Sequence, residues 1–391
     1  MKNVIIGVCL FFAIAVQAQT SVEEVLKLVE SSNRELRAQD ELTKSQKLDA
    51  RTGNYLPNPT IEYEHLWGKH PGSGIGRELT VSQGFDFPTA YGNRSQIAKL
   101  KSVQYDHERA LFRQELLLQA KEVCIELIYL QNKKAFLDNR LSVAQKLSEV
   151  YLRRLKEGDA NALEINRIEL EQINIQTESD LNDIEIVSKL AELSALNGGE
   201  EIQFNATLYP DDKIVPDFDV LMASYSAKSV ELQRLDSEQK VAGKEIALSK
   251  ANVLPKFELG YKGDYSGNEK FNGVLVGMSI PMFESKNTIK RAKAQARFAE
   301  LRQESVSFAL RTELQKLYDQ AQALNNSLQK VNAIIGRFGD LALLNKALDA
   351  GHISLTEYLN ELVPRYQSKE AMLLLERDYQ LALARLYKFE L

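Results

Sequence analysis

Residues 90–157 read AYGNRSQIAKLKSVQYDHERALFRQELLLQAKEVCIELIYLQNKKAFLDNRLSVAQKLSEVYLRRLKE. The stretch holds a single glycine, Gly92, and no proline, so nothing in it interrupts a helix. Apolar and small residues recur near its end with 4-3-4-3-4 spacing, the seam of a coiled coil: Leu137, Leu141, Ala144, Ser148, Tyr151 and Leu155. About 65 residues at ~1.5 Å per residue predict a helix near 100 Å long.

The helical pattern reverses and then occurs a second time. It breaks at Gly158, restarts through Ile165, and ends at the glycines of residues 197–199. A second long helix is expected from 286 to 350, with a break at Gly351 and a return helix from 355 to the C-terminus. Shorter helices are expected at 21–54 and 217–252, and a linker with a short strand at 200–216.

Four remaining segments alternate with period two, which predicts two β-hairpins. Their strands are expected at 60–67, 77–85, 256–265 and 271–280. Each has roughly 8–10 residues, close to the ~9–11 that cross a bilayer when tilted. Aromatic residues toward the loop ends are candidates for membrane-interface positions: Tyr63, Trp67, Tyr261 and Tyr265. An ordinary two-sided sheet of a soluble domain is the alternative.

The chain repeats its own order of elements. Tyr55-Leu56-Pro57 matches Val253-Leu254-Pro255, and the pattern Leu-x-x-Gly with a glutamate six residues later occurs at both helix reversals. We therefore predict a first repeat at 19–199 (β-hairpin 60–85, tip at 158), a linker at 200–216 and a second repeat at 217–391 (β-hairpin 256–280, tip at 351).

Residues 1–18 are predicted to be a cleaved signal peptide. Lys2 is followed by an apolar stretch and by small residues before Gln19. Cys9 lies inside this signal, which argues against a lipoprotein anchor, and Cys124 is then the one cysteine of the mature chain, so no disulfide is expected. After Ala18 no run is apolar enough to predict a transmembrane helix. The formal charge of −5 among 391 residues argues against nucleic-acid binding.

Four strands cannot close a barrel, because the smallest membrane barrels have about eight. An open sheet edge in lipid leaves backbone groups unpaired, at a cost of several kcal/mol each. If the strands span a membrane, the barrel must be shared between chains: two chains give eight strands and three give twelve. These constraints require an oligomer without fixing its number.

Three stretches resemble the TolC-like outer-membrane efflux factor family: 55–60 (YLPNPT), 79–88 (LTVSQGFDFP) leading to Arg94, and 348–359 (LDAGHISLTEYL). The heavy-metal (cobalt-zinc-cadmium) efflux branch is the nearest. The resemblance covers nearly the whole mature chain. Gly84 departs from it, since a proline is common there, whereas Pro281 keeps the pattern in the second half.

The resemblance implies a mainly α fold with a membrane β part. Long antiparallel helical hairpins would cross the periplasm of a Gram-negative cell, and four strands per chain would contribute to a trimeric 12-stranded barrel in outer-membrane lipid. It implies a homotrimer acting as the passive exit duct of a tripartite system, with a periplasmic adaptor (membrane fusion) protein and an inner-membrane RND-type pump as partners. The exported compound is not readable from the sequence.

The resemblance also suggests site residues at the periplasmic tips. Six are candidates for docking the adaptor: Leu155, Gly158, Ala162, Leu348, Gly351 and Leu355. Three are candidates for a periplasmic gate: Glu357, Glu164 and Asn360. A ring of three Glu357 carboxylates is expected to favour cations or raised pKa values. Solvated helix-surface glutamates and plain glycine-broken turns are the alternatives.

No catalytic, cofactor or metal site is predicted. Four histidines are scattered without ligand spacing, and no Gly-x-Ser-x-Gly or His-Glu-x-x-His motif occurs. These absences argue against a periplasmic hydrolase. A periplasmic coiled-coil adaptor, or a structural protein of an export complex, is the other alternative. Such an adaptor carries one long hairpin, whereas this chain is expected to have two.

Overall fold

The computed structural model describes residues 21–70, 74–210, 215–266, 269–336 and 341–391, so the predicted signal peptide lies outside the described residues. The helices are α1 Val22–Ser32, α2 Arg34–Thr52, α3 Pro88–Glu157, α4 Ala162–Leu196, α5 Phe218–Lys228, α6 Val230–Ala251, α7 Thr288–Ile335, α8 Ala342–Asp349 and α9 Leu355–Leu386, followed by a 3-10 turn, η1, at Lys388–Glu390. The strands are β1 Thr60–Trp67, β2 Ile75–Phe85, β3 Lys256–Ser266 and β4 Glu269–Ser279.

Three expected helices are divided, each for a local reason. Asn33 takes an extended conformation and accepts a hydrogen bond from the Leu36 amide (2.8 Å), so the first helix becomes α1 and α2. Ser229 separates α5 from α6 in the same way. The long second helix ends at Ile335, before Gly336, and α8 begins at Ala342. The strand expected in 200–216 was wrong, because the described part of this linker contains none.

The chain forms two compact units that cut across the two predicted repeats. Among the described residues, unit 1 comprises residues 21–32, 119–210, 323–336 and 341–384, and unit 2 comprises residues 33–70, 74–118, 215–266, 269–322 and 385–391. Helices α3, α7 and α9 each pass from one unit into the other. The repeat boundaries therefore remain a prediction from the sequence.

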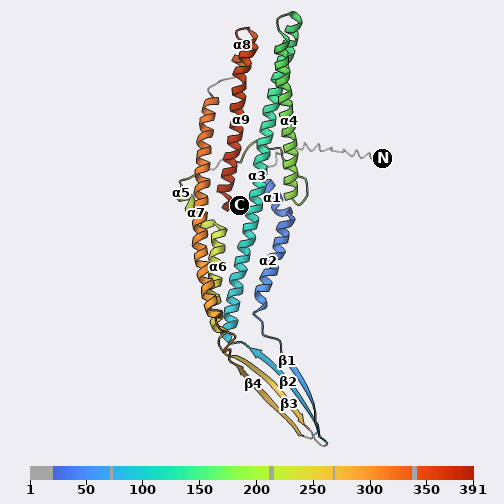
Figure 1. Cartoon of the computed structure of the whole chain (residues 1–391), viewed down its shortest axis with the longest axis vertical. Helices are drawn as coiled ribbons and strands as arrows, with labels where there is room; N and C mark the ends of the chain where they lie inside the picture. Colours follow the sequence, from blue (N-terminus) through green and yellow to red (C-terminus); the bar gives the residue numbers. More distant parts are fainter. Residues whose placement is uncertain (1–20, 71–73, 211–214, 267–268, 337–340) are drawn as a thin grey trace, which may run out of the picture. The chain divides into compact units, whose positions relative to one another are not determined.

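Unit 2 contains the sheet, whose strands are antiparallel in the order β1-β2-β3-β4. Thr60 pairs with Ser82, Ser82 with Gly260, and Gly260 with Leu275, so one continuous register runs across all four strands. The sequence places α2 directly before β1, α3 after β2, α6 before β3 and α7 after β4. All four helix ends consequently meet the same end of the sheet (Figure 1).

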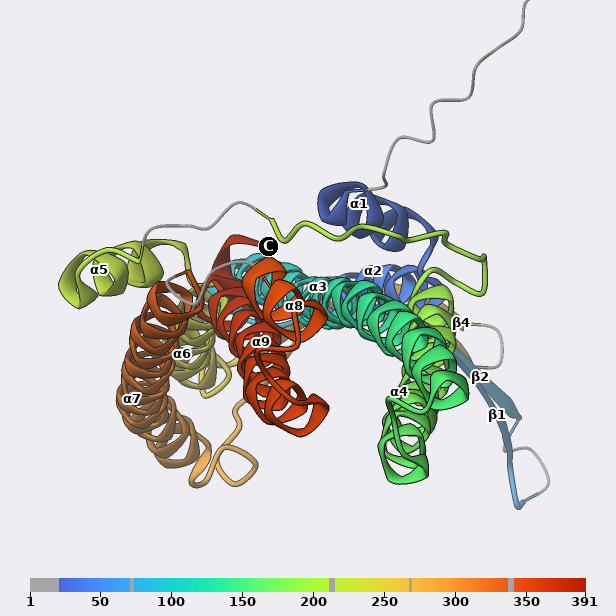
Figure 2. The same ribbon diagram turned by 90° about the horizontal axis from the view of Figure 1, so that it is seen from above.

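Unit 1 contains two helical hairpins that pack on each other. The C-terminal part of α3 runs beside α4, and α8 lies beside the start of α9 (Figures 1 and 2). Lys134 of α3 pairs with Asp183 of α4 at 2.6 Å on the outside of the first hairpin. Between the hairpins lies a shared core with members from α3, α4, α8 and α9: Tyr151, Ile165, Ile168, Leu348, Leu355, Tyr358, Leu359, Leu362 and Tyr366.

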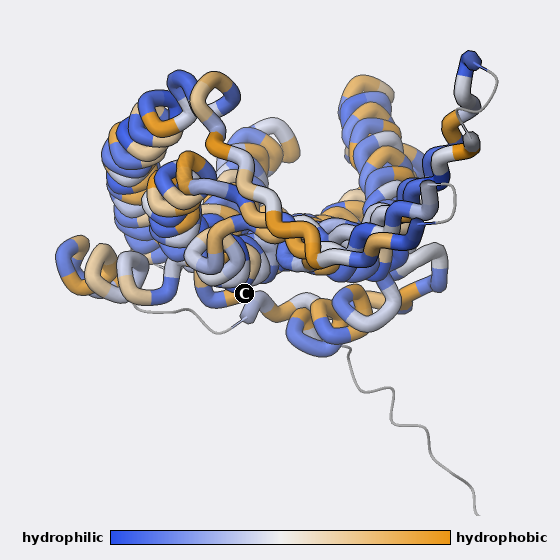
Figure 3. Tube along the Cα trace, turned by 90° about the horizontal axis from the view of Figure 1, so that it is seen from below, coloured by the Kyte–Doolittle hydropathy of each residue, from blue (hydrophilic) through white to orange (hydrophobic). Residues whose placement is uncertain are grey.

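Hydrophobic and hydrophilic residues alternate along the helices, as expected for helices with one buried face (Figure 3). Among the described residues, no helix has an apolar stretch long enough to cross a bilayer.

Candidate functional site

The two faces of the sheet differ in chemistry. Residues directly opposite each other on paired strands project to the same face, so the register assigns every side chain. One face is apolar, and its side chains are largely exposed, with 78% for Trp67 and 81% for Val274. Its apolar members are Ile61, Tyr63, Trp67, Ile75, Leu79, Val81, Phe85, Phe257, Leu259, Tyr261, Tyr265, Val274, Val276 and Met278. Five polar residues share the face, all but Gln83 in the half nearer the loops: His65, Arg77, Gln83, Lys270 and Asn272. We call it the apolar face.

The opposite face is polar. It carries six carboxylates and two lysines among the described residues: Glu62, Glu64, Glu78, Glu258, Asp264 and Glu269, with Lys256 and Lys262. Three large apolar residues also lie on it: Leu66, Phe271 and Leu275. Lys262 forms an ion pair with Glu78 on the neighbouring strand. A sheet with one exposed apolar face and one acidic face fits a boundary between lipid and water.

Both edges of the sheet are open in the described part of the chain. β1 pairs only with β2, and β4 pairs only with β3. Each outer edge therefore presents a row of backbone N–H and C=O groups, a template for pairing with another strand.

The four candidate interface aromatics share the apolar face but do not share one level. Tyr63 lies opposite Leu79, which lies opposite Gly263, so Tyr265 is two residues closer to the loops than Tyr63. Trp67 is the last residue of β1. Tyr261 does not lie toward a loop end as expected, because it is the central residue of the eleven in β3. Its hydroxyl donates to Asn272 Oδ1 at 2.8 Å.

The two helix reversals have the same backbone geometry. Gly158 and Gly351 have φ values of 84° and 71°, in the left-handed region that residues with a Cβ avoid. The amide after each glycine bonds back across the turn, from Asp159 to the Arg154 carbonyl at 2.8 Å and from His352 to the Ala347 carbonyl at 2.9 Å. Each glycine thus closes the C-terminus of a helix.

The two candidate gate glutamates cap the helices that follow the reversals. Glu164 forms a reciprocal capping box with Asn161, with both bonds between 2.9 and 3.0 Å. Glu357 accepts from the Ser354 amide at 2.8 Å and from the Ser354 hydroxyl at 2.9 Å. The hydrogen bond from the Ser354 backbone amide lowers the pKa of Glu357 most, and the bond from the Ser354 hydroxyl lowers it further. The raised pKa expected for a ring of three carboxylates stays a prediction, because it requires Glu357 of neighbouring chains.

The six candidate docking residues fall into two groups. Leu348 and Leu355 are 6% and 2% exposed, because they belong to the core between the two hairpins, so they are not free to contact an adaptor. The other four are exposed: Leu155, Gly158, Ala162 and Gly351. Helix α4 also has a stripe of exposed apolar residues that the sequence analysis did not predict as a surface feature. Its members are between 63% and 78% exposed: Leu163, Leu170, Ile173, Ile184 and Val187. Its 7-3-11-3 spacing was the available signal.

Asn360 connects the two hairpins. Its side-chain oxygen accepts from Arg167 Nη2 of α4 at 3.3 Å, and Arg167 Nη1 also reaches the Thr356 hydroxyl at 3.5 Å. Pro364 lies inside α9 and has no N–H, so the Asn360 carbonyl loses its usual partner four residues later. A polar link and a weakened helix turn therefore coincide at Asn360.

A charged cluster joins α3, α4 and α9 farther from the tips. Arg140 of α3 pairs with Glu171 at 3.0 Å and Glu178 at 3.4 Å, both on α4. Lys133 bridges Glu178 and Glu370 of α9, at 3.0 and 3.6 Å. These pairs are partly buried. Three of them join α3 to α4 within the first hairpin, and the pair of Lys133 with Glu370 links that hairpin to α9 of the second.

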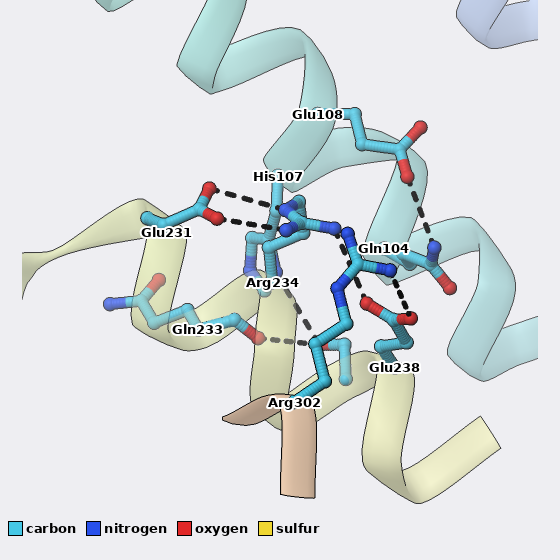
Figure 4. Close-up of polar contacts among 9 residues, drawn as sticks. Gln104, His107, Glu108, Glu231, Gln233, Arg234, Glu238 and Arg302 are labelled. Atoms are coloured by element: carbon cyan, nitrogen blue, oxygen red, sulfur yellow. Dashed lines mark hydrogen bonds and ion pairs between the residues drawn. The ribbon is translucent and has the colours of Figure 1, made fainter. Parts of the chain in front are cut away.

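Unit 2 has a second polar cluster, between α3, α6 and α7 (Figure 4). Arg234 pairs with Glu231 at 2.8 Å and with Glu238 at 3.4 Å, and Glu238 also pairs with Arg302 of α7 at 3.3 Å. The hydrogen bonds that Arg234 donates to Glu231 raise the pKa of Arg234. Ser237 of α6 lies beside this cluster, and its hydroxyl oxygen is 3.4 Å from His107 Nδ1 of α3.

Comparison with known proteins identifies the fold. Residues 222–389 match the family model of the outer membrane efflux protein. No protein of curated function matches the sequence. Three solved structures superpose over most of the chain: a membrane protein from Pseudomonas aeruginosa (TM-score 0.78, 13% identity, 94% of this chain and 93% of that one), VceC from Vibrio cholerae (0.76, 13%, 94% and 95%) and CusC (0.73, 15%, 95% and 92%).

The chain has the fold of an outer-membrane efflux channel. In this fold, a four-stranded antiparallel sheet is joined to paired helical hairpins, as in this chain. The matching family is one of channels rather than enzymes.

Within this efflux-channel fold, the described residues hold no group of three or more His, Cys, Asp or Glu side chains that could bind a metal. Cys124 is buried and unpaired, and its burial raises the pKa of the thiol to about 12. It is therefore a packing residue rather than a reactive one.

Proposed function

We propose that the chain is the outer-membrane channel of a tripartite efflux system, a passive exit duct from the periplasm to the exterior. The observation that carries the proposal is the four-stranded sheet, which has an apolar and an acidic face and two open edges. In lipid, this sheet must find strands from other chains. The acidic face would then line water and the apolar face would contact lipid.

Three copies would form one barrel. Strand β4 of one chain would pair with β1 of the next, which keeps the antiparallel order around the ring. Three chains give twelve strands, and the number three rests on the resemblance to the TolC-like family. The chain would reach the outer membrane as a mature form beginning at Gln19, after removal of residues 1–18.

The helical tips are proposed as the docking site for a periplasmic adaptor, which would join the duct to an inner-membrane RND-type pump. The exposed residues Leu155, Gly158, Ala162 and Gly351 support this role, and Leu163 extends the same surface. The heavy-metal branch is supported by the sequence resemblance alone. The fold matches CusC and VceC about equally well, with TM-scores of 0.73 and 0.76.

The gate is proposed to depend on Asn360 and Arg167 rather than on a ring of free glutamates. Glu164 and Glu357 are engaged in helix caps, whereas the contact between Arg167 and Asn360 joins the two hairpins. Opening would separate α9 from α4 and break this contact. The weakened turn at Pro364 supports bending at that level.

Cell fractionation and an unboiled gel test the proposed function. The expected result is a heat-modifiable oligomer in the outer-membrane fraction, with single-channel currents when the purified protein is added to planar bilayers. A water-soluble monomer that has no affinity for detergent would contradict the proposal and favour an adaptor or a structural role.

A further inference from the structure

The helix ends next to the sheet are strongly basic. Four segments meet there: residues 49–59, 86–101, 244–256 and 280–300. Together they contain 12 Lys and Arg against 5 Asp and Glu, a net charge of +7 in a chain whose formal charge is −5. The charge is therefore concentrated at one level of unit 2.

Most of these cations have no carboxylate partner in the described part of the chain. Four of the five carboxylates form an ion pair with a local cation, at 2.6 to 4.0 Å: Asp86 with Arg94, Glu245 with Lys101, Glu284 with Lys256, and Glu300 with Arg297. The eight other cations are all exposed: Arg51, Lys99, Lys244, Lys250, Lys286, Lys290, Arg291 and Lys293. We call these eight residues the basic girdle.

Exposed apolar side chains occupy the short connections between the girdle and the sheet. Tyr55 and Leu56 precede β1 and are 74% and 52% exposed, and Met282 and Phe283 follow β4 and are 74% and 86% exposed. From the sheet outward, the order is thus an apolar face, exposed aromatic and aliphatic residues, and then cations. A lipid leaflet presents hydrocarbon, interface and headgroup phosphates in that same order.

The distances fit the thickness of a headgroup layer. Lys293 lies five residues after the first residue of α7, Lys244 lies seven before the last residue of α6, and Lys99 lies eleven after the first residue of α3. At ~1.5 Å per residue these offsets are roughly 8, 10 and 16 Å along the helices, so Lys99 marks the outer limit of the girdle. Headgroups occupy about 5–8 Å beyond the hydrocarbon, and the Debye length adds about 8 Å at physiological salt.

We infer that the basic girdle binds the anionic phospholipid headgroups of the membrane leaflet on the helical side of the barrel. The inference rests on the proposed function, because it requires the sheet to span a bilayer. Phosphate contacts around the whole oligomer would fix the depth of the barrel. They would also give the channel a preference for anionic over zwitterionic lipid.

Native mass spectrometry of the full-length oligomer tests this inference. The protein is exchanged from detergent into an equal mixture of phosphatidylglycerol and phosphatidylcholine, and the retained lipids are counted. The wild type is expected to retain phosphatidylglycerol at least tenfold over phosphatidylcholine. The variant K286Q/K290Q/R291Q/K293Q is expected to fall below threefold, and salt near 1 M should reduce the wild-type preference in the same way, since the Debye length falls to ~3 Å.

A matched control removes the same charge elsewhere. Lys146, Arg311, Lys316 and Lys330 are exposed, and the nearest along α7, Arg311, lies 23 residues beyond its start, roughly 34 Å. The K146Q/R311Q/K316Q/K330Q variant should keep the wild-type preference. If the α7 variant does not assemble, K244Q/K250Q on α6 provides the second test and should reduce the preference at least twofold.

Three outcomes would overturn the inference. The first is equal retention of the two lipids by the wild type, and the second is an equal loss of lipid preference in the girdle and control variants. The third is a girdle variant that keeps the wild-type lipid preference but loses binding to isolated peptidoglycan, which would mean that the cations contact the cell wall instead of lipid. If the wild type forms no membrane oligomer, the proposed function itself fails. A stable oligomer without lipid preference refutes only the role of the girdle.

Discussion

Arg140 of α3 lies over the ring of Tyr366 of α9, with its guanidinium carbon 4.9 Å from the ring centroid. The same guanidinium pairs with Glu171 and Glu178 of α4, so one side chain connects three helices of unit 1. Burial raises the pKa of Tyr366 to about 12, which keeps the ring neutral beside the cation. This arrangement combines a cation–π contact with a partly buried ion pair.

Replacing Arg140 with leucine is expected to loosen α9. The Tyr366 ring would lose its cation, Glu171 would lose its partner, and Glu178 would keep only Lys133. Because the two carboxylates are about 30% exposed, the cost should be roughly 2 kcal/mol rather than that of a fully buried pair. Hydrogen exchange in the α9 amides should rise about 30-fold. Lys134→Leu, which removes an exposed pair, should change exchange less than fivefold. Equal effects of the two variants would argue against a special role for Arg140.

Gly260 should not tolerate alanine, whereas Gly273 should. A Cβ at Gly260 would lie 2.5 Å from the Val81 carbonyl oxygen and 3.0 Å from the Ser82 Cα, both backbone atoms that cannot move aside. A Cβ at Gly273 would meet no atom within 4 Å. We expect Gly260→Ala to cost about 1–3 kcal/mol and to reduce the heat-modifiable oligomer on gels. A normal oligomer yield from Gly260→Ala would show that the β2–β3 register is wrong.

The first turn of α9 should become less stable in acid. The pKa of Glu357 is lowered by its bonds to Ser354, so this carboxylate stabilises the folded tip above the unfolded-state pKa. That contribution is lost as the pH falls through the lowered folded-state value. Ser354→Ala should raise the Glu357 pKa and increase exchange in the first turn of α9 near neutral pH. A titration of Glu357 unaffected by Ser354→Ala would exclude the capping box as its cause.

Comparing Glu357→Ala with Asn360→Ala distinguishes a residue that caps a helix from one that holds the gate closed. Since Glu357 caps a helix and Asn360 links the hairpins, Asn360→Ala should raise the open probability of single channels in planar bilayers more than Glu357→Ala does. Both recordings should use the same salt and voltage. A loss of cation selectivity in Glu357→Ala, with no change in Asn360→Ala, would instead support the carboxylate ring.

Truncation to alanine should destabilise the tips strongly at Leu348 and hardly at all at Leu163. Leu348 is 6% exposed in the core between the hairpins, so Leu348→Ala should cost about 2–4 kcal/mol and increase exchange in α8 and α9. Leu163 is 78% exposed, and Leu163→Ala should leave exchange within about twofold of wild type. A large effect at Leu163 would mean that another surface covers it in the isolated protein.

The elements that local pattern determines were predicted well. β1 has the expected bounds, and α3 begins two residues before the expected 90. Both depend on the hydrophobic period and on the scarcity of glycine and proline, which are properties of a short window. The breaks at Asn33 and Ser229 were missed, although Asn and Ser are preferred N-cap residues and supplied a local signal.

The tip residues show where local pattern is insufficient. The capping boxes could have been recognised from Asn161 with Glu164 and from Ser354 with Glu357, each with a spacing of three. The burial of Leu348 and Leu355 could not, because it results from contact between hairpins that are nearly 200 residues apart in sequence. Heptad spacing shows that a residue faces a partner, but it does not show whether that partner belongs to the same chain.

The open edges of β1 and β4 also matter before the channel exists. Under the proposed function, a newly translocated chain would expose both edges and its apolar face in water, where any two copies can pair out of register and aggregate. Productive assembly therefore competes with misassembly at a rate that rises with chain concentration. Under the proposed function, a factor that shields the strands during transit would favour productive assembly, and overproduction is expected to increase the aggregated fraction.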